Sequence, residues 1–144
     1  MKNLFLYVSV VIFTLVFFVE CKTLTAAITD KQWNLTEVQG SKVTLTSAPF
    51  LVIASEQTRI SGNAGCNSFF GNYQMADKGK IAFSGVAMTR KFCVDSIANV
   101  VENQFSNIFE KVENYKANEK ELTFTDKNGV VLAKFKLAEK QISE

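Results

Sequence analysis

The chain has 144 residues, of which 47% are hydrophobic and 21% are charged. These proportions predict one globular domain and exclude a disordered or fibrous chain. The 16 basic and 14 acidic residues leave a net charge of +2 and are scattered along the sequence without a long run of one sign. Nucleic acid is therefore not expected as a partner.

The amino-terminal segment differs from the rest, because Lys2 is followed by a mostly apolar, uncharged run over residues 4–19. This pattern predicts a signal peptide over residues 1–20. A retained membrane anchor is the alternative, but a spanning helix needs about 20 apolar residues and this run is shorter. Export is favoured.

Cys21 stands where the apolar run ends, as in the lipobox of bacterial lipoproteins, whose cysteine becomes the lipidated first residue. Phe18, Val19 and Glu20 occupy the positions where such a motif has Leu, a small residue and Gly or Ala. Cleavage after Ala27 is the alternative and would discard Cys21. We expect lipidation at Cys21 and attachment to a membrane of the bacterial cell envelope.

Most of the remaining chain has the pattern of β-strands. Apolar and polar residues alternate over residues 33–38, 80–88 and 121–126. Residues 50–54 form a short apolar run after Pro49, typical of a buried strand. We expect turns at residues 77–80 and at Ser84-Gly85.

The last two strands are expected to pair, because Asn128-Gly129 is a two-residue signal for a tight hairpin. The final strand then places four apolar residues on one face of the sheet, namely Val131, Ala133, Phe135 and Leu137. Lys134 and Lys136 lie on the other face. This alternation predicts an antiparallel sheet with one face buried.

Residues 95–115 break the period of two and predict an amphipathic helix, with Asp95 or Ser96 as its cap. The apolar stripe consists of Ile97, Val100, Val101, Phe105, Ile108, Phe109 and Val112. A membrane or partner surface is the alternative, but we expect this stripe to pack on the sheet. The fold class is thus α+β: a mostly antiparallel, strongly curved sheet or open barrel with one long helix packed against it.

Turn-forming residues gather in residues 61–73, SGNAGCNSFFGNY. Their three glycines, Gly62, Gly65 and Gly71, predict backbone conformations closed to other residues, and Asn63, Asn67 and Asn72 predict local turns. Phe69 and Tyr73, or Phe70 on the opposite face, are expected in the core. The stretch lacks the Gly-Lys-Ser/Thr ending of a nucleotide-binding loop.

Without Cys21 the mature chain has two thiols, Cys66 and Cys93, in a compartment where disulfides persist. A bond between them would close a loop of about 28 residues and stabilise the fold by about 3.5 kcal/mol. Two cysteines without histidine make a poor zinc site, and the absent histidine removes the commonest base that activates a thiol.

From residue 32 to about residue 137 the sequence resembles the META domain family, which includes HslJ-like bacterial proteins. The resemblance rests on Trp33-x-Leu35 and Gly40, on residues 62–73, on MTRKFC at residues 88–93, on Glu102 and Phe105, and on Leu122-x-Phe124. The matching motif residues are Trp33, Gly62, Gly65, Asn67, Gly71, Tyr73 and Thr89. The expected organisation is a linker over residues 21–31, a META domain over 32–138 and a tail over 139–144.

The resemblance implies a mostly β domain of envelope and stress-linked lipoproteins. We expect a noncatalytic module without a cofactor or metal, which binds an envelope protein or maintains the envelope under stress. A carrier of small apolar ligands inside the barrel is the alternative, raised by 13 phenylalanines. An enzyme using Arg90, Lys91, Asp95 and Glu102 near Cys93 is the weakest hypothesis. The family also occurs where thiols stay reduced, so a close pair of free cysteines competes with the disulfide.

Overall fold

The computed structural model describes residues 28–139. The expected signal peptide, Cys21 and most of the carboxy-terminal tail lie outside these residues. The strands of the described chain are β1 (Gln32–Val38), β2 (Ser41–Lys42), β3 (Phe50–Ala54), β4 (Arg59–Asn63), β5 (Ser68–Ala76), β6 (Lys80–Met88), β7 (Asn114–Ala117), β8 (Glu121–Thr125) and β9 (Val131–Leu137). Two short 3₁₀ turns, η1 (Glu56–Thr58) and η2 (Asp77–Gly79), and one helix, α3 (Ser96–Ile108), complete the elements.

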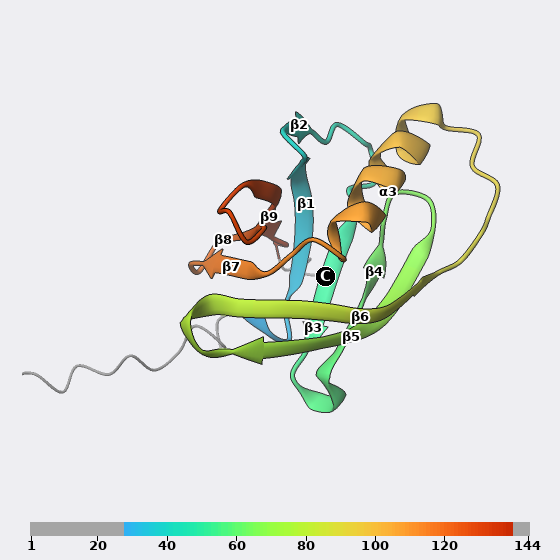
Figure 1. Cartoon of the computed structure of the whole chain (residues 1–144). Helices are drawn as coiled ribbons and strands as arrows, with labels where there is room; N and C mark the ends of the chain where they lie inside the picture. The colour runs from blue at the N-terminus through green and yellow to red at the C-terminus, as the bar shows by residue number, and fades with distance from the viewer. Residues whose placement is uncertain (1–27, 140–144) are drawn as a thin grey trace, which may run out of the picture.

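The strands form one antiparallel sheet that closes into a barrel of eight strands (Figure 1). Its order runs from β1 through β3 to β9 in sequence, and β9 pairs again with β1 from Trp33↔Leu137 to Val38↔Ala133. The short β2 extends only the end of β1. The predicted fold of a strongly curved antiparallel sheet with one amphipathic helix is confirmed, and the β1–β9 pairing makes the barrel closed.

Alternation along β5 shows how the sequence directs side chains into the barrel. Phe69 and Tyr73 are buried, whereas Phe70 between them is exposed. The expected arrangement with Phe69 and Tyr73 in the core is therefore confirmed, and the alternative with Phe70 in the core is not observed. Successive side chains of a strand point to opposite faces, so a single register sets all three.

Aromatic rings fill the barrel interior. The Phe105 ring of α3 lies 5.5 Å from Phe69 and 5.8 Å from Phe135 between ring centroids. Phe69 and Phe109 are 5.1 Å apart, and Phe124 and Phe135 are 5.2 Å apart. Because these spacings suit edge-to-face and tilted ring pairs, helix and strands share one core.

The helix begins as predicted but ends earlier. The Asp95 carboxylate accepts hydrogen bonds from the backbone N–H groups of Ile97 and Ala98, which makes Asp95 the N-cap. The helix ends at Ile108, and the last residues of the predicted segment form a turn and β7. Phe109 and Val112 are buried in the turn although they are not helical. Their apolar spacing therefore extended the helical pattern in the sequence beyond the true end of the helix.

Two members of the predicted apolar stripe do not pack in the core. Ile97 is 59% exposed and Val100 is 57% exposed. The buried helix residues are Ala98, Val101, Phe105 and Ile108, so the core-facing stripe is narrower than the sequence pattern suggested. The prediction that Ile97 and Val100 belong to the core is therefore wrong.

The Ser84-Gly85 turn is also absent. β6 continues through these residues, and its register with β5 shifts between Phe70↔Ala87 and Asn72↔Ser84. This shift is a β-bulge, and Gly85 has φ +60° within it. The bulge bends β6 instead of ending it. The expected turn at residues 77–80 is present as η2.

The last two strands pair as predicted, but the loop between them is longer than two residues. It spans residues 126–130, with the Asp126 carboxylate accepting from the N–H groups of Asn128 and Val130. A register shift beside Thr125 then leaves Val131 exposed and buries Leu132. The predicted buried face therefore holds for Ala133 and Phe135 but not for Val131.

The closed barrel has its shortest strand pairing between β6 and β7, which separate along most of the length of β6. These strands pair only at Lys80↔Asn114, and the Ile81 N–H donates to the Glu113 carbonyl. The helix occupies the connection between the two strands and inserts Phe105 into the barrel core. In the described part of the chain, no helix has the length and apolar content needed to span a membrane.

Candidate functional site

A polar cluster joins the two cysteine motifs to the helix, and its centre is Asn67, which is only 3% exposed. The Asn67 side-chain oxygen accepts from the Lys91 N–H at 2.7 Å and from the Thr89 hydroxyl at 2.8 Å. The Asn67 side-chain amide donates to the Glu102 carboxylate at 2.9 Å. Asn67 therefore does not bond its own turn, as the sequence suggested, but links three segments.

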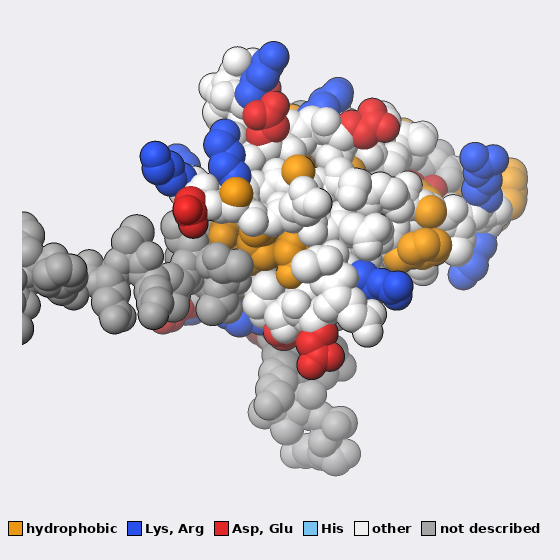
Figure 2. All heavy atoms as spheres, turned by 60° about the horizontal axis from the view of Figure 1, so that its bottom comes forward, with side chains coloured by type: hydrophobic (Ala, Val, Ile, Leu, Met, Phe, Trp, Pro, Cys, Tyr) orange, Lys and Arg blue, Asp and Glu red, His pale blue; other side chains and the backbone are white. Residues whose placement is uncertain are grey.

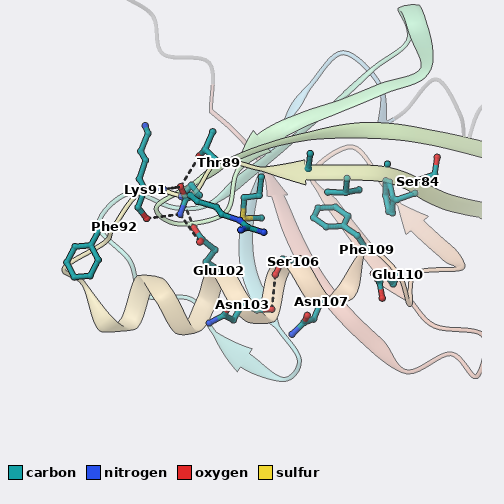
Figure 3. A pocket seen from close by; sticks show the side chains of 17 residues that line it. Ser84, Thr89, Lys91, Phe92, Glu102, Asn103, Ser106, Asn107, Phe109 and Glu110 are labelled. Atoms are coloured by element: carbon teal, nitrogen blue, oxygen red, sulfur yellow. Dashed lines mark hydrogen bonds between the residues drawn. The ribbon is translucent and has the colours of Figure 1, made fainter.

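Glu102 is the residue of α3 that takes part in this polar cluster. Its second carboxylate oxygen accepts from the Asn67 backbone N–H at 2.6 Å and from the Cys66 N–H at 3.3 Å. Figure 3 shows Glu102 pointing from α3 toward the loop that carries Thr89 and Lys91. A carboxylate that accepts several N–H groups is an effective structural clamp.

The disulfide lies beside this clamp. Cys66 and Cys93 are bonded, with their Cα atoms 6.2 Å apart. The Asn99 side-chain amide donates to the Cys93 carbonyl at 3.1 Å, so the helix also holds the second cysteine. The disulfide and the hydrogen bond from Asn99 thus fix the loop of residues 89–95, which we call the distal loop.

The other predicted motif residues act in packing. The Trp33 indole donates to the Ile28 carbonyl and the Tyr73 hydroxyl to the Ala54 carbonyl, each at 2.9 Å. Gly65 has φ +131° and lies against the helix, and Asn63 accepts its N–H in the expected turn. Gly62 and Gly71 instead lie in strands where a Cβ would clash, with the Phe50 carbonyl and with Val86 respectively. Gly62 and Gly71 were predicted to adopt backbone conformations closed to other residues, but the structure requires glycine there because neighbouring atoms leave no space for a side chain.

Two ionisable groups outside the clamp have shifted pKa values. The Ser55 side chain and its backbone N–H, which donates at 2.9 Å, lower the pKa of Asp30. Burial, and secondarily the negative charge of Asp30, raises the pKa of Tyr73. Asp30 joins the start of the described chain to Ile53 and Ser55, whereas the Tyr73 hydroxyl of β5 donates to the Ala54 carbonyl at the end of β3.

The four charged residues of the enzyme hypothesis are not gathered around a common point. The Asp95 and Glu102 carboxylates accept backbone N–H groups. Arg90 and Lys91 are exposed on the distal loop, and Figure 3 shows the Lys91 side chain directed away from α3. Among the described residues, no cluster of three or more His, Cys, Asp or Glu side chains could hold a metal ion.

A groove of about 1080 Å³ lies between the second half of β6 and the helix (Figure 3). Phe83 and Phe109 contribute to its apolar part, with ring centroids 5.3 Å apart. Asn103 and Asn107 line it from the exposed face of α3, and Glu110 lines it from the turn that follows the helix. Asn67 and Glu102 reach it at the end occupied by the distal loop.

Exposed apolar side chains lie on the distal loop and on the first turns of α3, and one of them, Phe92, also lines the groove. Phe92 is 94% exposed and Val94 is 92% exposed, and Ile97 and Val100 follow on the outer face of α3. We call these four residues the apolar tip. Figure 2 shows Lys and Arg side chains beside hydrophobic ones at the right-hand end of the molecule, where Figure 1 shows the distal loop projecting.

The sequence did not mark the groove or the apolar tip. Asn103, Asn107 and Glu110 read only as the polar side of an amphipathic helix, and Phe92 read as part of a cysteine motif. The one available signal was the adjacent pair Val100 and Val101, because neighbouring helical residues point about 100° apart and a narrow buried stripe holds only one of them. Glu102 was noted as a match to the family pattern, but its partners across the fold could not be inferred.

Two solved structures resemble this fold, and both were determined by NMR. One, a protein from Burkholderia xenovorans, has a TM-score of 0.64 and 20% sequence identity, and the match covers 81% of this chain and 87% of that one. The other has a TM-score of 0.66 and 24% identity, covering 83% of this chain and 99% of that one. At these identities the likeness concerns the fold. No curated protein matches the chain.

The family comparison is more specific. A family model of the META domain matches residues 26–139, which include both cysteine motifs, the helix and every strand of the barrel. The chain therefore belongs to the META domain family.

Proposed function

We propose that this protein is a noncatalytic envelope lipoprotein whose META domain binds another protein and thereby helps to maintain the envelope under stress. The observation that carries the proposal is the apolar tip beside the groove. Four exposed apolar side chains next to two exposed cations form a surface that is typical of a contact site for a partner.

The position of this surface supports a protein partner over the anchoring membrane. The described chain enters the barrel beside Ile53, whose carbonyl accepts from the Asp30 N–H. The distal loop leaves from the other end of the strands, where Thr89 bonds Ser68. Cys21 and Ile28 are seven positions apart in the sequence, a stretch of chain that reaches at most about 25 Å. An anchor at Cys21 would hold the entry end near the membrane and leave the apolar tip facing away from it.

The use of the charged residues supports the noncatalytic part of the proposal. Glu102 and Asp95 accept hydrogen bonds that hold the helix and the distal loop, and Cys66 and Cys93 are bonded to each other. A general acid or base needs a proton that it can exchange with a substrate. Carboxylates already committed to backbone N–H groups are poor candidates for that role.

The carrier of small apolar ligands has less support. Phe69, Phe105 and Phe135 occupy the barrel interior. The ring centroid of Phe105 lies 5.5 Å from that of Phe69 and 5.8 Å from that of Phe135. Barrels of eight strands are about wide enough for their own side chains. The rings that suggested a ligand pocket therefore pack against one another.

The proposal can be tested with a photoreactive amino acid placed in the full-length protein in intact cells. Positions Phe92 and Asn103 probe the apolar tip and the groove, and Glu119 in the β7–β8 turn is the matched exposed control. We expect one envelope protein to be captured from both test positions and not from Glu119. Capture of the same products from all three positions, or of none, would contradict the proposal.

A further inference from the structure

We propose that the groove binds an extended segment of the partner protein, which adds to the barrel as a strand along the free edge of β6. This inference rests on the proposed function and specifies how the partner binds. It starts from the pairing of β6, which has β5 along one edge but meets β7 only at Lys80↔Asn114. Beyond Lys80, the second edge has no strand partner among the described residues.

The backbone groups of this edge face the groove. The Ile81 N–H points away from β5, because it donates to the Glu113 carbonyl. Backbone groups alternate in direction along a strand, so those of Phe83 point the same way. Past the bulge, the backbone N–H of Thr89 donates to the Ser68 carbonyl and so points toward β5. The backbone N–H and C=O of the preceding residue, Met88, therefore point outward again. Phe83 and Met88 thus offer donors and acceptors to a new strand.

The opposite wall of the groove suits an extended peptide and not an apolar helix. Asn103 and Asn107 lie on the exposed face of α3, and Glu110 lies in the turn after it. All three side chains can bond backbone groups of a peptide. Phe83 and Phe109 provide an apolar surface for alternate side chains of the added strand. Main-chain hydrogen bonds with pockets for alternate side chains define strand addition as a binding mode.

Charge gives the partner segment a direction. Arg90 and Lys91 are exposed at the distal end of the groove, and neither takes part in an ion pair with a described residue. Glu110, in the turn after α3, lines the groove toward its opposite end, on the side of Phe109 (Figure 3). An antiparallel strand would start near Met88 and end near Phe83. The partner segment should therefore carry Asp or Glu before the strand and Lys or Arg after it.

The experiment uses a displayed library of random 12-residue peptides, selected on the full-length protein in detergent micelles. We expect enriched peptides with an acidic amino-terminal end and alternating apolar residues. Amide hydrogen exchange provides the direct test, because the N–H groups of Phe83 and Met88 should exchange rapidly in the free protein and slow at least tenfold with peptide bound. The N–H groups of Ala82 and Ala87 point toward β5 and serve as internal controls, protected in both states.

A matched pair of variants gives a second test. Met88→Pro removes the outward N–H of the free edge, whereas Met88→Ala changes the side chain and keeps the N–H. We expect Met88→Pro to weaken binding of a selected peptide about tenfold relative to Met88→Ala. If the proline variant does not fold, hydrogen exchange of the unmodified protein still decides the question.

Three results would overturn the inference. The first is that no peptide is enriched, and the second is that enriched peptides leave the exchange of Phe83 and Met88 unchanged. The third is self-association of the free protein in sedimentation that Met88→Pro abolishes, which would identify a second copy as the occupant. If crosslinking in cells captures a partner while the Phe83 and Met88 amides stay unprotected in that complex, the proposed function stands and strand addition is wrong.

Discussion

The side-chain amide of Asn67 and the carboxylate of Glu102 meet at 2.9 Å, and the backbone N–H of Asn67 donates to the same carboxylate at 2.6 Å. This pair joins the turn before β5 to the helix, 35 positions later in the sequence. Because Asn67 also binds Thr89 and Lys91, one asparagine sets the position of both the helix and the distal loop. The shape of the groove depends on this contact.

Replacing Glu102 with glutamine should destabilise the fold by about 1–3 kcal/mol. Each carboxylate oxygen accepts from an N–H group, and an amide side chain can present only one acceptor oxygen. Urea unfolding measures the change. Glu110→Gln, at an exposed position in the turn after the same helix, is the control and should change stability by less than about 0.5 kcal/mol. Equal effects of both substitutions would contradict this role of Glu102.

Removing the disulfide should lower the melting temperature of the oxidised protein. The cysteines are 27 positions apart, and closure of a loop of this length contributes about 3.5 kcal/mol in the chain-entropy account. The double variant Cys66→Ala with Cys93→Ala should melt lower than the oxidised parent. Reductant should destabilise the parent and leave the double variant unchanged. A parent that is insensitive to reductant would show that the thiols are free in solution.

Asp30 should contribute to stability in a pH-dependent way. Its folded-state pKa lies below its ordinary value, because the Ser55 side chain and backbone N–H favour the ionised form. The contribution is therefore fully present above the unfolded pKa of about 3.9 and is lost as the pH falls through the folded pKa. At pH 7 the Asp30→Asn variant should melt below the parent, and this difference should shrink toward zero in strong acid. A difference that stays constant with pH would exclude a role for the charge.

The same substitution should change the ionisation of Tyr73. Burial raises the pKa of its phenol, and the negative charge of Asp30 adds to that increase. Removing the charge should bring the pKa of Tyr73 down toward its ordinary value, while burial keeps it raised. Phenolate absorbance followed during alkaline titration measures this shift, with Tyr73→Phe identifying the Tyr73 signal. An unchanged Tyr73 titration would show that Asp30 does not act on it.

Lipidation at Cys21 remains a prediction from the sequence. We expect the mature protein to partition with membranes into detergent and to lose this behaviour in the Cys21→Ala variant. Intact-mass measurement should find acyl chains on residue 21. A mature amino terminus at Ile28 would rule out the anchor, and with it the argument that the apolar tip faces away from the membrane.

The sequence by itself determined the family, the period of most strands and the start of the helix at Asp95, because these depend on local spacing and on motifs. β4 and the short β7 were missed, since β4 contains Ser, Gly and Asn, and the first two residues of β7 fell within the segment predicted as helix. Local sequence patterns do not show which strand or helix a segment will pack against in the folded protein.

Only the tertiary structure decided how these elements combine. Pairing of β1 with β9 closes the barrel across about a hundred positions of sequence, and no local signal specifies that contact. The same holds for the clamp between Asn67 and Glu102, and for the separation of β6 from β7 that creates the groove. Ile97 and Val100 are exposed because the barrel leaves room for only a narrow stripe of α3. Helical spacing identified an apolar face, but the packing against the barrel determined which of its residues remain available to a partner.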